Sequence, residues 1–493
     1  MTTIAIAILT VFNLGMLLYF FLLNGVYLVL ILLAFRALRN YALRLETLDP
    51  EDALRRAGAP PITVIAPAFN EAETCVESVH SLLNLNYPDR EVIFVNDGST
   101  DDTLNRLRHA FQLQATARLS TADLPTAAVR GVYLSRLHPR LWVIDKDNGG
   151  KADALNAGIN FTTSPLFCAV DADSILERDA LSRIVRPFLE DDHTIAAGGV
   201  IRIANGCTVR QGIITDVRLP KNRLAQLQVL EYLRAFLAGR IGLSSVGMTL
   251  IISGAFGLFK RETVVGAGGY ATARTSGETV GEDMELIVRL QRYCKEHRIP
   301  GRITFVPDSV AWTECPESLR VLGRQRDRWQ RGLADALIRH RVMLGNPRYG
   351  VIGLLAFPYF FFLEMLGPAI EVLGYLAFVW TLVLGLWTPL YVIAFLMVAV
   401  VFWVAISVGA VVLEELTFRR YLLLRDLLRL FLIAILENFG YRQISTYWRA
   451  RGLLSAARGV RSWGEMDRVG FDQSAADQRQ KSQDPDKPIA KLR

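Results

Sequence analysis

The stretch LFCAVDAD at residues 166–173 leads five apolar residues into two carboxylates, Asp171 and Asp173. A short apolar run of this kind is typical of a buried strand that ends in an acidic loop. Two carboxylates separated by one residue can converge on a divalent cation, and Mg²⁺ or Mn²⁺ prefers oxygen ligands that it shares with phosphates. Because the same pattern is also typical of a solvated loop, the surrounding sequence has to decide between the two interpretations.

The surrounding sequence predicts an alternation of strands and helices. Three further apolar runs are expected to form strands: residues 62–67, 91–95 and 141–144. Helices are expected from near Asn70 and after Thr100. This order predicts βαβ units and a mainly parallel sheet. Ligands bind such sheets beyond the carboxyl ends of the strands, where both NDGS (96–99) and DAD (171–173) fall, so a site is expected there.

Apolar segments flank this α/β region and raise the mean hydropathy of the chain to +0.26. The first, about residues 4–35, has no basic residue before it and is too long for a signal peptide, so we expect a transmembrane anchor. Two more crossings are expected at about residues 367–387 and 389–413. Residues 351–366 predict an interfacial or re-entrant helix. The run 427–446 contains charges that are costly in hydrocarbon, so it is either a crossing that faces a polar cavity or a surface helix.

The net charge of +7 comes largely from arginines beside the apolar runs. These are Arg36, Arg39, Arg44, Arg419 and Arg420. Their position follows the positive-inside rule, which places the α/β region in the cytoplasm. The charge therefore indicates the lipid bilayer as a partner and not nucleic acid. The five cysteines include no C-x-x-C pair, which is typical of a reducing compartment.

Three other motifs carry candidate functional residues. In GED (281–283), Asp283 could act as a general base, although acids are also common at a helix N-terminus. In QRDRW (325–329), Gln325, Arg328 and Trp329 share one helical face that suits phosphate and a sugar ring, or the surface of a membrane. NGGK (148–151) could cradle phosphate through its backbone and Lys151, but it lacks the P-loop pattern.

In this order the motifs resemble those of the family 2 inverting glycosyltransferases, in particular the processive membrane branch with cellulose, chitin and hyaluronan synthases. The resemblance covers about residues 60–340. It rests on seven motifs: PAFNE (67–71), NDGS (96–99), GGKADALN (149–156), DAD (171–173), SGA (253–255), GED (281–283) and Q-x-x-R-W (325–329). It implies an α/β domain of the GT-A type inserted between transmembrane helices.

The resemblance also implies a role for each site residue. The donor site would be formed by Pro67, Glu71, Asp97, Lys151, Asp171, Gln325 and Arg328. Within it, Glu71 and Asp97 would contact the uridine and Lys151 the diphosphate. Asp171 and Asp173 would bind Mg²⁺ or Mn²⁺ with the diphosphate. Asp283 would be the base of a single in-line displacement, and Ser253, Gly254 and Trp329 would contact the acceptor.

The chain departs from the family pattern in three places. The motif T/S-E-D appears as GED, no match to the gating-loop sequence of the cellulose synthases is found, and one anchor precedes the α/β region where some relatives have two. WGEMDR (463–468) follows the last apolar run, as similar stretches do in other members of the wider branch.

The expected organisation has six parts. These are an anchor (1–36), a linker (37–60), a GT-A domain (61–316), interface helices (317–348), a membrane region (349–452) and a tail (453–493) that is disordered from about residue 473. The expected function is polymerisation of sugar from a UDP-sugar into an extracellular or cell-surface polysaccharide, coupled to translocation. The expected location is the inner membrane, in several passes, with accessory export or periplasmic subunits as candidate partners. The alternatives are a transferase that adds one sugar to a membrane lipid and a nucleotide-regulated transporter.

Overall fold

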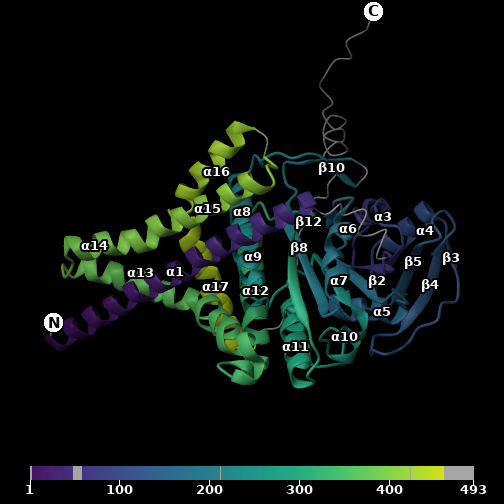
Figure 1. Ribbon diagram of the computed structural model, residues 1–493, viewed down its shortest axis with the longest axis horizontal. Helices are drawn as coiled ribbons and strands as arrows, with labels where there is room; N and C mark the ends of the chain where they lie inside the picture. The colour runs from purple at the N-terminus through teal and green to yellow at the C-terminus, as the bar shows by residue number, and fades with distance from the viewer. Residues whose placement is uncertain (1–2, 48–57, 211, 422, 460–493) are drawn as a thin grey trace, which may run out of the picture.

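The computed structural model describes residues 3–47, 58–210, 212–421 and 423–459. An α/β domain built around a twisted sheet lies at one end, and long helices extend from it at the other (Figure 1). The stretch WGEMDR and the tail from residue 473 lie outside the described residues, as do residues 48–57 of the expected linker.

The sheet has ten strands within the described residues, in the order β3-β4-β5-β2-β1-β6-β11-β8-β12-β7. In chain order they are β1 (Ile62–Ala68), β2 (Arg90–Asp97), β3 (Leu113–Ala115), β4 (Val129–Ser135), β5 (Leu141–Lys146), β6 (Leu166–Val170), β7 (Ile175–Leu176), β8 (Thr194–Ile203), β11 (Phe256–Lys260) and β12 (Arg302–Thr313). The four expected strands are confirmed as β1, β2, β5 and β6, and they pair in parallel at the centre. The sheet as a whole is mixed, because β4 and β11 flank this centre antiparallel to it.

Both faces of the sheet are covered, so its central strands are buried throughout. Along β1, Val64 and Ala66 pack into one apolar core and Ile65 into the other, as the alternation of side chains in a strand requires. The helices of this domain are α3 (Cys75–Leu83), α4 (Thr103–Phe111), α5 (Lys151–Phe161), α6 (Ala180–Ile184), α7 (Arg186–Glu190), α10 (Arg261–Gly266) and α11 (Glu282–Glu296). Continuous apolar strands of this kind are typical of a sheet with two covered faces.

The first helix of the domain begins later than the sequence predicts. Helix α3 begins at Cys75 instead of near Asn70, because Asn70 has a left-handed backbone conformation with φ 56°. The Asn70 carboxamide oxygen accepts a hydrogen bond from the Thr100 backbone N–H at 2.8 Å. This contact joins the loops that follow β1 and β2, so the residues before α3 form part of the strand-end surface.

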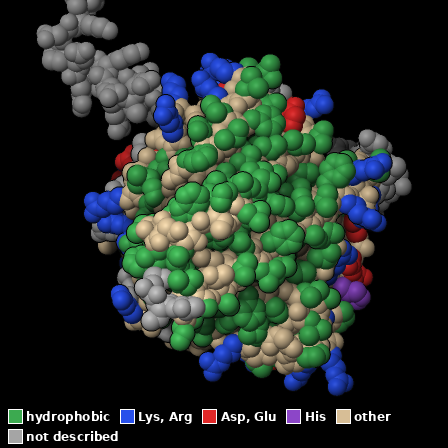
Figure 2. Space-filling view, turned by 90° about the vertical axis from the view of Figure 1, so that its left-hand side faces the viewer, with side chains coloured by type: hydrophobic (Ala, Val, Ile, Leu, Met, Phe, Trp, Pro, Cys, Tyr) green, Lys and Arg blue, Asp and Glu red, His purple; other side chains and the backbone are tan. Residues whose placement is uncertain are grey.

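Long apolar helices form the other end of the molecule. Helix α1 (Thr3–Thr47) continues past residue 36, so the first part of the expected linker is helical. Two helices, Ile6–Leu45 and Pro389–Thr417, are long and apolar enough to cross a membrane. A third span results if Ile352–Met365 and Gly367–Val383, bent by 44°, count as one. Viewed end-on, this face is largely hydrophobic, with Lys and Arg around its edge (Figure 2).

The carboxy-terminal helical region contains several shorter elements. They are η4 (Ile352–Ala356), η5 (Tyr359–Met365), α13 (Gly367–Val383), α14 (Pro389–Leu396), η6 (Met397–Val401), α15 (Phe402–Thr417), α16 (Leu424–Leu436) and α17 (Tyr441–Ala457). The run 427–446 is not one helix, because the chain turns at Gly440, whose φ of 107° suits glycine. Glu437, beside this turn, is buried and accepts a hydrogen bond from Arg234 at 2.8 Å.

Helices at the junction join the two parts. They are α8 (Arg223–Leu233), the π-helical η1 (Arg234–Arg240), α9 (Ile241–Ser245) and α12 (Leu319–Arg339). A buried ion pair also crosses the junction: Arg202 of β8 donates two hydrogen bonds to Glu414 of α15, at 2.9 and 2.7 Å. Both side chains are 3% exposed. The parallel, two-pronged geometry is the strongest that these two groups form.

Candidate active site

One large cavity runs along the carboxyl edge of the parallel strands and continues into the helical region. Its volume is about 2290 Å³, well above the roughly 300–1,000 Å³ of most small-molecule pockets. Its lining includes every residue that the sequence singled out: Pro67, Glu71, Asp97, Lys151, Asp171, Asp173, Ser253, Gly254, Asp283, Gln325, Arg328 and Trp329. Side chains separated by up to 262 positions in the chain therefore meet in one space.

At one end of the cavity, Asp97 is held in place by its own neighbours. Its carboxylate accepts hydrogen bonds from the backbone N–H groups of Gly149 (3.1 Å) and Gly150 (2.8 Å). It also pairs with Lys146 at 2.5 Å, and Lys146 pairs in turn with Asp153 at 2.8 Å. The sequence analysis missed Lys146, although a lysine at the end of a strand that begins with four apolar residues was a usable signal. Asp97 thus fixes the NGGK loop, whatever else it contacts.

Lys151 stands at the N-terminus of α5 and faces two acids. Its Nζ lies 2.5 Å from Asp171 Oδ1 and 3.3 Å from Glu282 Oε1. Burial alone would lower the pKa of Lys151, but Asp171 and Glu282 raise it above its ordinary value. For Glu282, burial disfavours the charged carboxylate and so raises the pKa, and the charge of Lys151 offsets part of that rise. Lys151 therefore stays positively charged. It lies where the carboxyl end of β6 meets the N-terminus of α11.

The acidic side chains at the Lys151 end of the cavity are too few to hold a metal ion without additional ligands. Among the described residues, no three His, Cys, Asp or Glu side chains lie close enough together to hold a metal ion. Asp171 and Asp173 both line the cavity, at the end of β6. Mg²⁺ is commonly bound by one or two carboxylates together with substrate phosphates. The pair fits a cation of that kind only if a phosphate ligand completes the site.

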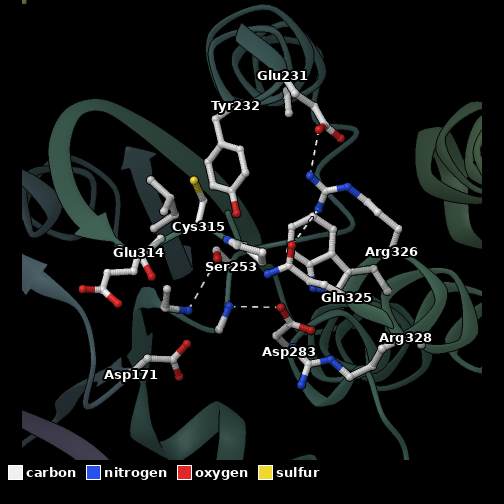
Figure 3. A pocket seen from close by; sticks show the side chains of 18 of the residues that line it. Asp171, Glu231, Tyr232, Ser253, Asp283, Glu314, Cys315, Gln325, Arg326 and Arg328 are labelled. Carbon is white, nitrogen blue, oxygen red and sulfur yellow. Dashed lines mark hydrogen bonds and ion pairs between the residues drawn. The ribbon is translucent and has the colours of Figure 1, made fainter. Parts of the chain in front are cut away.

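Asp283 is in the first turn of α11 and contacts the SGA segment. Its Oδ2 accepts a hydrogen bond from the Gly254 backbone N–H at 3.0 Å (Figure 3). A Cβ on Gly254 would lie 2.9 Å from Lys151 Nζ and 3.4 Å from Asp283 Cβ. A side chain at position 254 would therefore displace the ammonium group of Lys151, which closely approaches the backbone at this glycine. A cation and a carboxylate therefore both lie beside Gly254.

The QRDRW motif lies on α12, at the far side of Asp283. Trp329 is 44% exposed and Gln325 is 9% exposed, and both line the cavity together with Arg328. The expected shared face of the helix is therefore the one that borders the cavity. A half-exposed indole at this place offers an apolar surface to a ligand.

The sequence analysis missed the residues that hold this indole. The Arg326 guanidinium carbon lies 4.3 Å from the centroid of the Trp329 ring. Arg326 is buried and pairs with Glu231 of α8 at 2.7 Å (Figure 3). Tyr232, next to Glu231, points its hydroxyl toward the centre of the cavity, with its ring centroid 6.4 Å from that of Trp329. Because Arg326 precedes Trp329 by three residues, the two are neighbours on a helix, and this spacing could have identified Arg326 from the sequence.

Beyond Trp329 the cavity reaches the helical region, where its lining is charged. Three ion pairs lie there: Arg234–Glu437 at 2.8 Å, Arg442–Glu371 at 3.4 Å and Arg449–Glu364 at 3.2 Å. Trp403 of α15 borders the same space, with the guanidinium carbons of Arg442 and Arg234 at 3.9 and 4.6 Å from its ring centroid. Polar groups thus continue from the strand ends into the part of the molecule with the apolar outer surface.

Lys151 with its two acidic partners, the Asp283 carboxylate at Gly254 and the half-exposed indole of Trp329 all border this one cavity. Two family models match the chain: "Glycosyl transferase family 2" over residues 63–243 and "Glycosyl transferase family group 2" over residues 166–406. The chain belongs to the family 2 glycosyltransferases, and its mixed sheet with flanking helices is the GT-A-type domain of that family.

Curated relatives include poly-beta-1,6-N-acetyl-D-glucosamine synthases of staphylococci. The protein of Staphylococcus aureus (strain COL) is 29% identical over 280 residues, 56% of each chain. That of Staphylococcus epidermidis is 26% identical over 278 residues, again 56% of each. The match thus spans about half the length of these relatives. Among solved structures, a mannosyltransferase from Pyrobaculum calidifontis in complex with GDP-Man and Mn²⁺ is 19% identical, with a TM-score of 0.47 over 85% of this chain and 99% of the other.

Proposed function

We propose that this chain transfers a sugar from a UDP-sugar to a glycan acceptor, with inversion, in the cavity at the strand ends. The observation that carries the proposal is the meeting of a cation and a carboxylate at Gly254, where Lys151 and Asp283 both approach the same short segment. Lys151 would bind the diphosphate and Asp283 would accept the proton of the attacking hydroxyl. Pro67, Glu71 and Asp97 would complete the donor site, with Gln325 and Arg328 opposite them.

A divalent cation is part of the proposal. Asp171 and Asp173 would hold Mg²⁺ or Mn²⁺ together with the donor diphosphate, and the bound ion would stabilise the charge on the departing diphosphate. Lys151 already pairs with Asp171 at 2.5 Å, so it would share this carboxylate with the ion while it contacts the phosphates. The protein's own contribution is to fix both carboxylates at the end of β6.

The acceptor would be a growing polysaccharide. Trp329 would stack on its terminal sugar beside Ser253 and Gly254, and the continuation of the cavity past Trp329 supports a product longer than one sugar. The names of the staphylococcal relatives support N-acetylglucosamine as the first donor sugar to test. The same continuation supports release of the product between membrane helices. The arginines beside the apolar segments support an α/β domain in the cytoplasm at the inner membrane, and accessory export subunits would be partners in such a release.

Transfer of one sugar to a membrane lipid is the second candidate function. It would use the same donor site and base, but it leaves unexplained why charged side chains line the cavity beyond Trp329. A nucleotide-regulated transporter would need no base beside Lys151.

UDP release by the purified protein tests the proposal. UDP-N-acetylglucosamine, UDP-glucose, UDP-galactose and UDP-glucuronate would each be mixed with the protein and Mg²⁺ or Mn²⁺. We expect release with one of them, with UDP-N-acetylglucosamine as the first candidate. Absence of release with every donor would contradict the enzyme assignment. Product length then separates the two candidate transferases. A polymer supports the first, and a lipid carrying a single sugar supports the second.

A further inference from the structure

Arg240, the last residue of η1, is a cavity-lining arginine that the proposed reaction does not use. Its guanidinium carbon lies 3.9 Å from the centroid of the Phe236 ring, so one face of the group is covered. Its Nη1 is buried and has no hydrogen-bond partner among the described residues. Other arginines of the cavity wall, such as Arg234 and Arg326, pair with a carboxylate. A buried donor without a partner is costly, and a ligand can remove that cost.

The position of Arg240 relates it to the acceptor side of the site. Burial lowers the pKa of Arg240 to about 10, and its interactions with Asp283 and Tyr232 offset only part of this effect. Arg240 therefore lies within electrostatic reach of the proposed base and of the tyrosine beside Trp329. Lys151, in contrast, is surrounded by Asp171 and Glu282 at the donor end. The two cations thus serve different ends of the cavity.

The local backbone supports a binding role for this segment. Residues 234–240 form a π-helical stretch between α8 and α9. Single π-helical turns are rare and occur frequently at functional sites, because the wider turn redirects side chains. Tyr232 just before this stretch and Arg240 at its end both border the cavity. Tyr232, whose ring centroid lies 6.4 Å from that of Trp329, and Arg240 thus line the same cavity from one continuous segment.

We propose that Arg240 is an acceptor-binding residue that donates a hydrogen bond to an uncharged oxygen of the acceptor sugar. The inference rests on the proposed function, since it needs a sugar between Asp283 and Trp329. The oxygen is either a hydroxyl or the carbonyl of an N-acetyl group, because both accept from a guanidinium. Arg240 would hold the acceptor so that its nucleophilic hydroxyl faces Asp283.

The charge of the cavity argues for an uncharged acceptor group. Carboxylates outnumber cationic side chains among the lining residues, and the three cations of the inner part are each paired with a glutamate. An acidic polymer would meet like charges along this path, which is unfavourable in a partly buried space. A carboxylate bound at Arg240 would also lie near Asp283 and repel it. A neutral oxygen meets neither obstacle.

The test compares Arg240→Gln and Arg240→Lys in the full chain, with UDP-N-acetylglucosamine as donor. The acceptors are the β-1,6-linked tetramers of N-acetylglucosamine and of glucosamine. Arg223→Gln is the matched control, because Arg223 begins α8, which leads directly into η1, is exposed and lies outside the cavity lining. UDP binding to each variant reports on folding. Arg240→Lys keeps the charge, so it remains informative where Arg240→Gln fails to fold.

We expect Arg240→Gln to raise KM for the acceptor by about tenfold or more, the size of one hydrogen bond to a charged group. Arg240→Lys should have a smaller effect, and Arg223→Gln none. UDP release without acceptor should stay near the wild-type value, because Arg240 would not contact the donor. Loss of the preference for the acetylated tetramer would identify the amide carbonyl, whereas equal weakening of both acceptors would identify a hydroxyl; either outcome supports the proposal.

Two results would overturn it. One is an unchanged acceptor KM in both variants. The other is a shifted pH profile of kcat with an unchanged KM, which would mean that Arg240 acts on Asp283 and not on the sugar. Failure of the proposed function looks different, because the wild-type protein would then release no UDP with any donor.

Discussion

Gly281 and Gly332 touch across the contact between α11 and α12. A Cβ built on either residue would lie 2.7 Å from the Cα of the other, a distance that real Cβ atoms essentially never show. Gly281 stands two residues before Asp283, and Gly332 stands one helical turn after Trp329. This contact therefore sets the distance between the proposed base and the indole. It also gives a physical reason for GED in place of T/S-E-D, because a side chain at position 281 would push α12 away.

Gly332→Ala should therefore lower sugar transfer while it spares UDP binding. Displacement of a reacting group by about 1 Å can cost on the order of 10²-fold in rate, and we expect a loss approaching that size. UDP release with acceptor and UDP affinity would be measured side by side. Gly15→Ala is the matched control, since a Cβ there meets nothing within 4 Å. Wild-type transfer by Gly332→Ala would show that the contact does not set the geometry.

Asp283→Asn should slow transfer without weakening the donor. General base catalysis typically contributes about 10² to 10⁴-fold, so a loss in that range is expected. The carboxamide oxygen of Asn can still accept from the Gly254 N–H, which now bonds Asp283 at 3.0 Å, so the local structure should persist. Rates of UDP release and UDP affinity give the two readouts. Transfer at the wild-type rate would remove Asp283 as the base and make Glu282 the next candidate.

Removal of the divalent cation should abolish turnover. EDTA should stop UDP release, and added Mg²⁺ or Mn²⁺ should restore it, because the charge of the leaving diphosphate would otherwise stay unbalanced. Asp173→Ala should behave like chelation, since one remaining carboxylate holds the ion poorly. Asp89→Ala, at an exposed loop before β2 and outside the cavity lining, is the matched control. Full activity in EDTA is the outcome that excludes a metal.

Trp329→Ala should impair elongation more than donor hydrolysis. The indole offers a surface for the acceptor sugar, and the donor contacts lie at the other end of the cavity. Polymer yield and length would be compared with UDP release in the absence of acceptor. Trp329→Phe should retain part of the polymer, because an aromatic face remains. If Trp329→Ala loses UDP binding instead, α12 belongs to the donor site.

The orientation of the chain can be tested by cysteine labelling in a background without the five native cysteines. Ile4→Cys should react with a membrane-impermeant reagent added from outside. Ser120→Cys, in an exposed loop of the α/β domain, should react only after permeabilisation. The expectation follows from the arginines beside the apolar segments. The reverse pattern would place the α/β domain outside the cell.

The central parallel strands were predictable because each is an apolar run that ends in a polar turn. Those signals are local: β1 and β6, for example, agree with the expectation to within one residue. The antiparallel flanks were not predictable, since β4 and β11 contain polar or small residues and gain their place from long-range pairing. The start of α3 was wrong for a related reason: the left-handed conformation of Asn70 depends on its contact with Thr100.

The site residues were identified through motif order, and the structure collects them in one cavity. The residues that support them were missed because their partners are distant in the chain. In the sequence, Lys146 is only the last residue of a strand, and its ion pairs with Asp97 and Asp153 become visible only in the structure. Arg326 is likewise one arginine of a basic helix in the sequence, and its partner Glu231 lies on another helix. Periodicity identifies the face of a helix but not the side chain that meets it from another element.

The Arg202–Glu414 pair has a consequence for how the molecule can move. Separating these two groups would leave a buried charge uncompensated, which typically costs about 3–5 kcal/mol. The ion pair therefore resists a rocking movement of the sheet against α15. In the proposed polymerisation, the growing polysaccharide would therefore advance through movement at the cavity wall, while the sheet and α15 keep their relative position.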